Sequence, residues 1–233
     1  MNWQRHQLVW LHAAGWQAVL AGRADEPAAS EETLACLRHW AAHRLPLVVT
    51  RQPLVHPALG GAIASAEALL TLGLAAPTRW GRLRLFLRVA QSAVHRVGAF
   101  PLAPQIAHAL PAAAQADWRA LCAALRAAGL DARVYGSHGW QLLSGLACVR
   151  VGRSDIDLLL PCRSPEQADV AAALLASAAA TLPRIDGECV FDGGAAVAWR
   201  EWAAWRAGAT RQLLVKRLHG AALEDARDWT VMA

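Results

Sequence analysis

The chain has 233 residues and a formal net charge of +5, and 55% of its residues are hydrophobic while 18% are charged. This composition excludes an intrinsically disordered chain, and the length allows either one large domain or two small ones. The positive charge favours a polyanionic partner, which could be a phosphorylated cofactor, a nucleic acid or an acidic protein.

The cysteines and the apolar segments indicate the cellular compartment of the protein and whether it spans a membrane. The five cysteines are scattered, and no two of them have the spacing of a zinc site. We therefore expect reduced thiols, as in a cytoplasmic protein. His12 and Gln17 interrupt the N-terminal apolar run, and the Ala-rich stretch from Ala168 to Leu182 is too short to span a bilayer. The sequence predicts a cytoplasmic protein with no membrane-spanning segment.

Residues 1–110 are expected to form the smaller, α/β domain of the chain. Residues 3–19 suit either a helix or a pair of strands, and residues 22–30 suit a polar loop. Ser30 and the acids after it predict a helix to about residue 43, because serine caps helices and acids favour their positive end. Residues 45–52 predict a short strand, and the residues from Pro53 to Pro57 a loop. The Ala/Leu-rich residues 63–72, which follow two glycines, predict a helix.

Two groups of basic residues in this first domain could bind ligands. His39 and His43 have a spacing that suits a metal, but no third ligand accompanies them, so we expect a solvated helix face. From residue 82 to residue 88 arginine alternates with leucine, which predicts a half-buried strand. Its arginines form either a phosphate-binding face or a solvated one, and we select Arg82 and Arg84 as candidate substrate-binding residues.

Three prolines between residues 101 and 111 mark the expected boundary between domains at 1–110 and 111–233. An amphipathic helix is predicted over 112–128, and Gly129 ends it. Further along the chain we expect strands at 133–135 and 154–160, a short helix at 140–145 and an Ala-rich helix at 165–180. A hairpin is expected over 184–199 and a last strand over 213–218.

Two motifs in the second domain indicate phosphate chemistry with a metal. Gly136 would let the chain turn sharply beside a ligand, and Ser137 and the amides after it would face a phosphate at the positive end of a helix. Asp155 and Asp157 are two residues apart on a strand, so their carboxylates leave from one face. Such a pair repels itself unless a cation neutralises it, and Mg²⁺ prefers hard oxygen ligands. A surface turn followed by a charged strand edge is the less favoured interpretation.

A Gly-Ser turn, an Asp-x-Asp strand and a later acid together resemble the nucleotidyltransferase superfamily. The resemblance implies an α+β protein whose C-terminal domain has a mixed sheet with helices. Asp186 and Glu188 share one face of the next predicted strand, and either could be the third carboxylate, with Asp186 slightly preferred and Glu201 a weaker candidate. Lys216 could reach a phosphate or be a solvated lysine at a strand edge.

The residues around these motifs narrow the resemblance. It extends over Val134–Gln141 and Ser154–Leu158, and over Arg5–Leu11, Asp186–Glu188 and Val197–Glu201. These stretches resemble the malonate decarboxylase holo-acyl-carrier-protein synthases, a family also called phosphoribosyl-dephospho-CoA transferases.

The resemblance implies a reaction and a role for each motif. The enzyme would transfer 2′-(5″-phosphoribosyl)-3′-dephospho-CoA from the triphosphoribosyl-dephospho-CoA precursor to a serine of the acyl-carrier subunit of malonate decarboxylase, and diphosphate would leave. Mg²⁺ would be held by Asp155, Asp157 and Asp186. Asp186 or Glu188 would act on the serine hydroxyl. The terminal phosphates would be held by Gly136, Ser137 and His138, and the N-terminal domain would recognise the precursor or the carrier.

Two other functions are compatible with the same motifs. Another nucleotidyltransferase, acting on a small molecule, RNA or a protein, would keep the metal site and change only the acceptor. A non-catalytic nucleotide-binding or nucleic-acid-binding module would make the carboxylates dispensable. The sequence has no helix-turn-helix signature, zinc finger or basic run with interleaved aromatics, so we expect no nucleic-acid partner.

Overall fold

The computed structural model describes residues 2–24, 30–53 and 68–225. It has the expected α+β fold, with helices and two sheets. Contacts divide it into two compact units. Unit 1 comprises Met1–Ala99 with Leu146–Cys148 and Leu218–Gly220, and unit 2 comprises Phe100–Gly145 with Val149–Arg217 and Ala221–Ala233.

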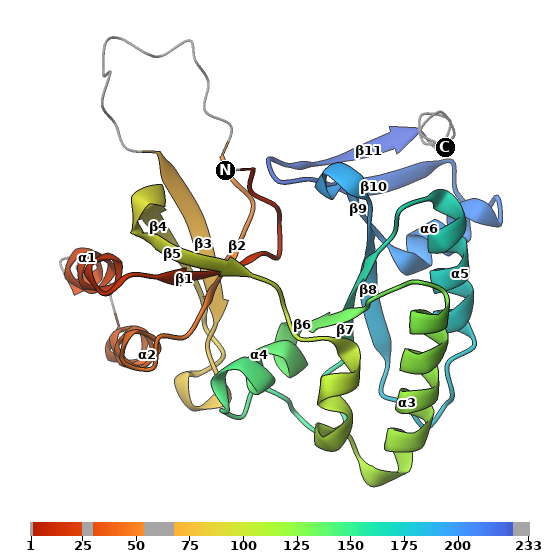
Figure 1. Ribbon diagram of the computed structural model, residues 1–233, viewed down its shortest axis with the longest axis horizontal. Helices are drawn as coiled ribbons and strands as arrows, with labels where there is room; N and C mark the ends of the chain where they lie inside the picture. The colour runs from red at the N-terminus through yellow and green to blue at the C-terminus, as the bar shows by residue number, and fades with distance from the viewer. Residues whose placement is uncertain (1, 25–29, 54–67, 226–233) are drawn as a thin grey trace. The chain divides into compact units, whose positions relative to one another are not determined.

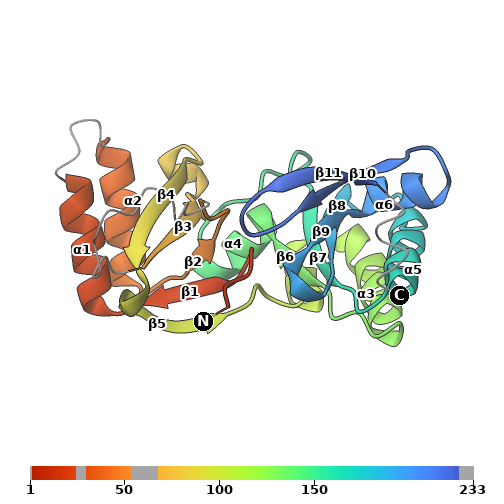
Figure 2. The same cartoon turned by 90° about the horizontal axis from the view of Figure 1, so that it is seen from above.

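Unit 1 has a five-stranded antiparallel sheet in the order β4-β3-β2-β1-β5. Its strands are β1 (Leu8–Leu11), β2 (Leu47–Val49), β3 (Leu69–Ala75), β4 (Arg84–Ala90) and β5 (Val94–Gly98). Helices α1 (Ala13–Ala24) and α2 (Glu31–Ala42) lie together on one side of this sheet (Figure 1, Figure 2). Short 3-10 turns η2 (Thr78–Trp80) and η3 (Gln91–Ala93) flank β4.

The predicted helix after Ser30 is confirmed, and so is its cap. The Ser30 hydroxyl accepts a hydrogen bond from the Thr33 backbone N–H at 3.2 Å, and two acids occupy the first turn. Residues 3–19 form neither of the two expected arrangements, because they hold a strand, β1, followed by the helix α1.

The expected helix at 63–72 is wrong over its described part, and residues 63–67 lie outside the described residues, as do residues 25–29 and 54–57 of the expected loops. Leu69–Ala75 is β3, which pairs along its whole length with β4. An apolar run rich in Ala and Leu suits both a buried strand and a helix, and here the partner strand decides.

The arginine strand begins two residues later than expected. In β4, Arg84, Phe86 and Arg88 are exposed, while the residues that alternate with them, Leu85, Leu87 and Val89, are buried. Arg82 precedes the strand, is half-buried and has a φ of 57°. Arg82 is therefore not part of the exposed strand face, which carries Phe86 between its two arginines.

Unit 2 has a six-stranded sheet in the order β11-β10-β9-β8-β7-β6. It is mixed, because β7 (Ile156–Pro161) and β8 (Ile185–Val190) are parallel while the other pairs are antiparallel. The remaining strands are β6 (Arg133–Tyr135), β9 (Ala196–Ala198), β10 (Gln212–Lys216) and β11 (Ala221–Asp225). The sequence did not predict β11.

The helices of unit 2 are α3 (Ala112–Ala127), α4 (Gly136–Ser144), α5 (Pro165–Ala176) and α6 (Trp199–Arg206), with 3-10 turns η4 (Ala103–Ala109) and η5 (Asp192–Gly194). Two boundaries differ from the prediction. Helix α4 starts directly at Gly136, and α5 ends at Ala176, four residues before the expected end. The expected hairpin is completed by β9, and α6 follows it without having been predicted.

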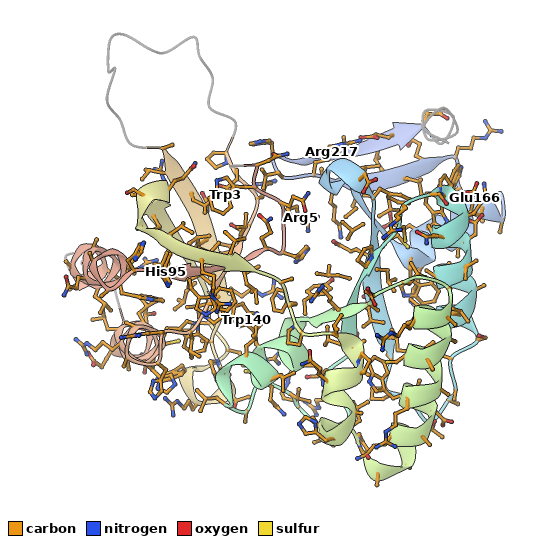
Figure 3. All side chains as sticks on the ribbon, viewed as in Figure 1. Trp3, Arg5, His95, Trp140, Glu166 and Arg217 are labelled. Carbon is orange, nitrogen blue, oxygen red and sulfur yellow. The ribbon has the colours of Figure 1, made fainter. Side chains whose placement is uncertain are left out.

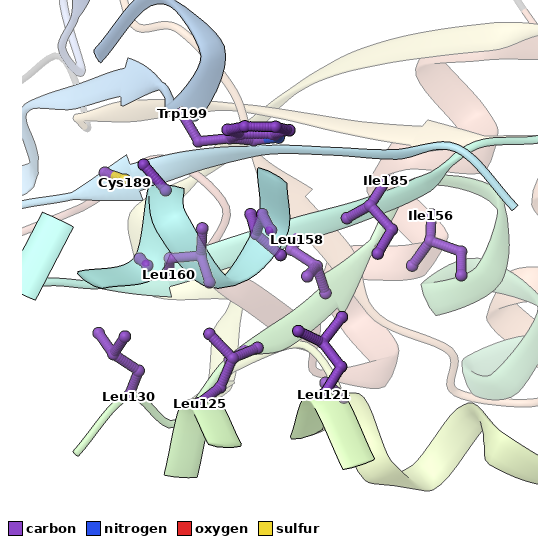
Figure 4. Packing of buried hydrophobic residues seen from close by; sticks show 14 of the residues in the cluster. Leu121, Leu125, Leu130, Ile156, Leu158, Leu160, Ile185, Cys189 and Trp199 are labelled. Carbon is purple, nitrogen blue, oxygen red and sulfur yellow. The ribbon is translucent and has the colours of Figure 1, made fainter. Parts of the chain in front are cut away.

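The core of unit 2 lies between the sheet and the helices α3, α5 and α6. Figure 4 shows Leu121 and Leu125 of α3 facing Leu158 and Leu160 of β7. Small alanines on the buried side of α5 let that helix approach the sheet closely. The apolar face of β7 is therefore part of the same core as α3 and α5.

Residues 100–110 belong to unit 2, whereas the sequence assigned them to the first domain. Ala103 N–H donates to Ala132 O at 2.8 Å, and Val134 N–H donates to Pro101 O at 2.9 Å. The indole N–H of Trp118, which is fully buried in α3, donates to Ala103 O at 3.0 Å. The prolines lie inside this connection, so the division falls before them, between Ala99 and Phe100.

All five cysteines are free and buried. Over the described part of the chain, none of the helices is long and apolar enough to cross a membrane.

We predict that Trp118→Phe lowers the free energy of unfolding by about 1–3 kcal/mol, because it leaves the Ala103 carbonyl buried without its donor. Urea unfolding followed by circular dichroism measures this change. Trp205→Phe is the matched control, since Trp205 is only partly buried against the same core. Equal losses in the two variants would show that the Trp118–Ala103 bond contributes nothing specific.

Candidate active site

At the start of strand β7 the polar and apolar side chains lie on opposite faces, whereas Leu159 further along is buried on the same face as Asp157. Ile156, Leu158 and Leu160 are fully buried in the core, while Asp157 between them is half-buried on the other face. Asp155 lies just before the strand, two residues from Asp157, so the alternation places its side chain on the same face. The alternation predicted from the sequence is therefore present, and it directs the Asp157 carboxylate away from α3 and α5.

The Gly136 backbone lies directly against the Asp157 carboxylate. Strand β6 pairs with β7 so that Tyr135 is the partner of Asp157, and Gly136 follows Tyr135. A Cβ built on Gly136 would overlap Asp157 Oδ2, and the φ of Gly136 is 59°. Both the close approach and the left-handed backbone require glycine here. The two sequence motifs therefore meet at one point.

Helix α4 begins at this point and is anchored by aromatic packing. Trp140 of α4 is buried against Phe100, with the ring centroids 5.5 Å apart (Figure 3). Gly139 lies so close to the Val134 carbonyl that a Cβ would overlap it. The first turn of α4, with Gly136 and the half-buried Ser137, is thus held beside Asp157, and its N–H groups make this the positive end of the helix.

His138 is directed into the protein. Its side chain is 5% exposed, and burial lowers the pKa of its imidazole, which favours the neutral ring at pH 7. The imidazole is therefore buried rather than displayed at the surface, and its expected contact with the terminal phosphates stays a prediction.

Asp186 is the carboxylate that the sheet brings beside Asp157. Strands β7 and β8 are parallel, and Asp157 and Asp186 are register partners, so both side chains leave from the same face of adjacent strands. Asp186 is half-buried, and its Oδ1 accepts the Gly187 N–H at 2.9 Å. A Cβ on Gly187 would overlap the Leu158 carbonyl, so glycine lets the two strands pair here.

Glu188 shares this face but is already paired with a lysine. It is 5% exposed, and the Lys216 Nζ donates to its Oε1 at 2.7 Å. Lys216 lies on β10 and keeps 33% of its side-chain exposure. The ammonium therefore compensates a buried carboxylate, which is a structural role that neither sequence interpretation of Lys216 included.

Asp155 lies beside the guanidinium of Arg184, a neighbour that the sequence did not predict. The Arg184 Nε lies 3.8 Å from Asp155 Oδ2, and both side chains are well exposed to solvent. Arg184 precedes β8 as Asp155 precedes β7, so only the parallel register reveals that they are neighbours. Glu201, the weaker candidate for the third acid, accepts the Leu214 N–H at 3.3 Å instead and so supports β10.

The donor set at this face suits a hard cation. Asp157 and Asp186 offer carboxylate oxygens from adjacent strands at paired positions, which is the kind of ligand that Mg²⁺ prefers. Within the described ranges, no group of three or more His, Cys, Asp or Glu side chains is arranged to hold a metal ion. Arg82 and Arg84, the other expected ligand-binding residues, belong to unit 1.

Comparison with known proteins covers nearly the whole chain. Residues 4–100 match the family model described as phosphoribosyl-dephospho-CoA transferase MdcG N-terminal domain, and residues 101–227 match the C-terminal domain of the same family. The junction of the two models, between residues 100 and 101, lies one residue from the division between the two units. No solved structure matches the chain with significance.

Curated relatives named phosphoribosyl-dephospho-CoA transferase support the same assignment. One from Xanthomonas euvesicatoria pv. vesicatoria is 36% identical over 214 residues, which is 91% of this chain and 89% of the relative. One from Bradyrhizobium diazoefficiens is 37% identical over 226 residues, or 95% of this chain and 89% of the relative.

We predict that Gly136→Ala destabilises unit 2 more than Gly145→Ala does. Both positions have a positive φ, but a Cβ at Gly145 meets open space whereas one at Gly136 overlaps Asp157. Gly145→Ala should cost about 1–2 kcal/mol of backbone strain, and Gly136→Ala about 1–3 kcal/mol more. Urea unfolding of both variants measures the difference in the free energy of unfolding. Equal losses would contradict the close contact between Gly136 and Asp157.

A second prediction concerns the buried ion pair. Lys216→Met leaves Glu188 buried without its cation and should lower the free energy of unfolding. A broken buried ion pair typically costs about 3–5 kcal/mol of the free energy of unfolding. Because the Lys216 side chain is 33% exposed, the loss here should not exceed that range. Changing Glu188 to Leu as well should restore most of it. Thermal or urea unfolding tests this, and a double variant no more stable than Lys216→Met would contradict the pairing.

Proposed function

The chain belongs to the phosphoribosyl-dephospho-CoA transferase family, and from that premise we propose its reaction. The enzyme transfers 2′-(5″-phosphoribosyl)-3′-dephospho-CoA from its triphosphate precursor to a serine of the acyl-carrier subunit of malonate decarboxylase, and diphosphate is released. The observation that carries this proposal is the meeting of Gly136, Asp157 and Asp186 at one face of the sheet in a chain of this family.

The proposed chemistry is a phosphoryl transfer. The serine oxygen attacks the first phosphorus of the triphosphate, and a new oxygen–phosphorus bond forms as the bond to the second phosphate breaks. The diphosphate leaves, and the serine hydroxyl loses its proton to a carboxylate. Positioning the phosphates and compensating their charge are the main tasks that such a transfer sets for the protein.

We propose Asp155, Asp157 and Asp186 as the ligands of Mg²⁺. Bound there, Mg²⁺ would supply positive charge to the triphosphate as the diphosphate leaves. The register of Asp157 with Asp186 supports this assignment. Asp155 would have to give up its contact with Arg184, which costs little because the pair is exposed to solvent.

Asp186 is the better candidate for the third carboxylate. Glu188 is buried and its charge is compensated by Lys216 within the fold, and its register partner on β7 is Leu159 rather than an acid. Asp186 is half-buried beside Asp157, and it would orient or deprotonate the serine hydroxyl. The first turn of α4, with Gly136 and Ser137, would receive the terminal phosphates.

The direct test is the intact mass of the apo acyl-carrier subunit after incubation with the enzyme, MgCl₂ and the triphosphate precursor. We expect a mass gain equal to the precursor minus diphosphate, and no gain when EDTA replaces MgCl₂. A gain that persists in EDTA would remove the metal from the proposal. Transfer of a nucleotide to a different acceptor, with none to the carrier, would assign the chain to another nucleotidyltransferase reaction.

We predict that Asp157→Asn and Asp186→Asn each reduce kcat for transfer by at least about a hundredfold, since each removes charge stabilisation from the reacting phosphates. Glu188→Gln is the matched variant on the same strand, two residues from Asp186, and it should keep most of the transfer activity while losing stability. Initial rates by mass spectrometry and thermal midpoints are measured for all three. A larger kcat loss in Glu188→Gln than in Asp186→Asn would exchange their assigned roles.

A further inference from the structure

Unit 1 contains a cavity of about 770 Å³ whose walls carry three arginines. Helix α1 contributes Arg23, the segment after β2 contributes Arg51, and β4 contributes Arg88 together with Phe86. This volume lies within the range of about 300–1,000 Å³ that is usual for small-molecule sites. Of the arginines of the β4 segment, Arg88 lines the cavity, whereas Arg82 and Arg84 do not.

Arg23 joins the helical wall of the cavity to its strand wall. The residue lies in the last turn of α1, and its Nη2 donates to the Phe86 carbonyl oxygen at 2.6 Å. This bond joins the guanidinium to the backbone of β4, where Arg88 follows two residues after Phe86. The Phe86 side chain itself is 58% exposed, which is unusual for a large apolar ring on a paired strand.

Gln52 fixes the segment that carries Arg51. Its side-chain amide is buried, and it donates to Thr50 O and to Thr71 O, both at 2.8 Å. The same amide accepts the Thr71 N–H through its Oε1 at 2.8 Å. The Gln52 side chain thus makes the two hydrogen bonds to Thr71 of β3 that a paired strand residue would make. These bonds fix the backbone from which the Arg51 side chain extends.

Two of the three cavity arginines, Arg51 and Arg88, have no carboxylate partner among the residues that the structure describes. Both arginines are exposed. Residues 1–99 contain ten Lys or Arg and five Asp or Glu, whereas residues 100–233 contain thirteen of each. The net charge of the whole chain therefore lies in the part that forms this cavity. Like charges around a concave surface repel each other, and a bound anion relieves that repulsion.

We propose that this cavity binds the adenosine diphosphate portion of the transferase's precursor, an inference that rests on the proposed function. Guanidinium groups match the geometry of phosphate oxygens, and Arg51 and Arg88 contact the diphosphate that joins adenosine to pantetheine. The exposed ring of Phe86 offers a flat apolar surface on which the adenine stacks. Unit 1 then holds the part of the precursor that does not react.

Isothermal titration calorimetry with dephospho-CoA tests this assignment. The probe has the adenosine diphosphate but no triphosphate, and its binding does not require any transfer. We expect Arg51→Ala and Arg88→Ala each to weaken binding about tenfold or more, as for the loss of one hydrogen bond to a charged group. Phe86→Ala should weaken it about fivefold through the lost stacking. Affinities within about twofold of the wild type in both arginine variants would overturn the proposal.

The matched control is Arg96→Ala. Arg96 is an exposed arginine of the same unit on β5, it lies over the Trp10 ring, and it does not line the cavity. We expect Arg96→Ala to bind dephospho-CoA as the wild type does. If it weakens binding as much as Arg88→Ala does, the general charge of unit 1 accounts for the effect, and the cavity assignment fails.

Transfer kinetics separate this inference from the reaction itself. In the Arg51→Ala/Arg88→Ala double variant, KM for the precursor should rise about tenfold or more, while kcat and KM for the carrier stay near the wild-type values. A raised KM for the carrier, with unchanged dephospho-CoA affinity, would make the cavity a docking surface for an acidic protein and overturn the proposal. A wild-type enzyme that binds dephospho-CoA through these arginines but transfers nothing would refute the reaction and leave the cavity assigned.

Discussion

The close approach of the Gly136 backbone to the Asp157 carboxylate is the constraint on which the arrangement of the acids in unit 2 depends. It exists because β6 pairs with β7 so that the glycine follows the register partner of the aspartate. On the other side of β7, Gly187 clears the Leu158 carbonyl and brings Asp186 level with Asp157. At each of the two positions a Cβ would overlap an atom of β7, so only glycine fits there. A larger side chain at either position would separate the acids from the helix end or from each other.

The same sheet face holds acids with different surroundings, on which their different proposed roles are based. Glu188 is buried and its charge is compensated by Lys216 from β10, so it ties two strands together and is costly to disturb. Asp157 and Asp186 stay half-buried at the end of the face where α4 begins. A carboxylate whose charge is compensated within the fold is a poor ligand for a cation, while one that keeps access to solvent can bind it. The environment, more than the residue type, assigns the role.

The two units also differ in charge, which suits a division of the work between them. Residues 100–233 balance their acids and bases, and the acids there serve both the fold and the proposed chemistry. Residues 1–99 carry the excess of arginine, and Arg51 and Arg88 extend into a cavity without a carboxylate partner among the described residues. Recognition of a large polyanion and transfer of one of its phosphoryl groups pose different electrostatic requirements. Separate units can meet each requirement without compromising the other.

The sequence by itself determined the features that depend on neighbouring residues along the chain: the cap at Ser30, the two faces of β7 and the family. The tertiary structure decided what depends on pairing between distant segments. It made residues 69–72 a strand, because β4 is their partner, and it assigned residues 100–110 to unit 2 through their bonds to α3 and β6. It also put Asp186 rather than Glu188 beside Asp157, and it turned His138 inward. Alternation and capping are local, whereas register and burial are set by residues far away in the chain.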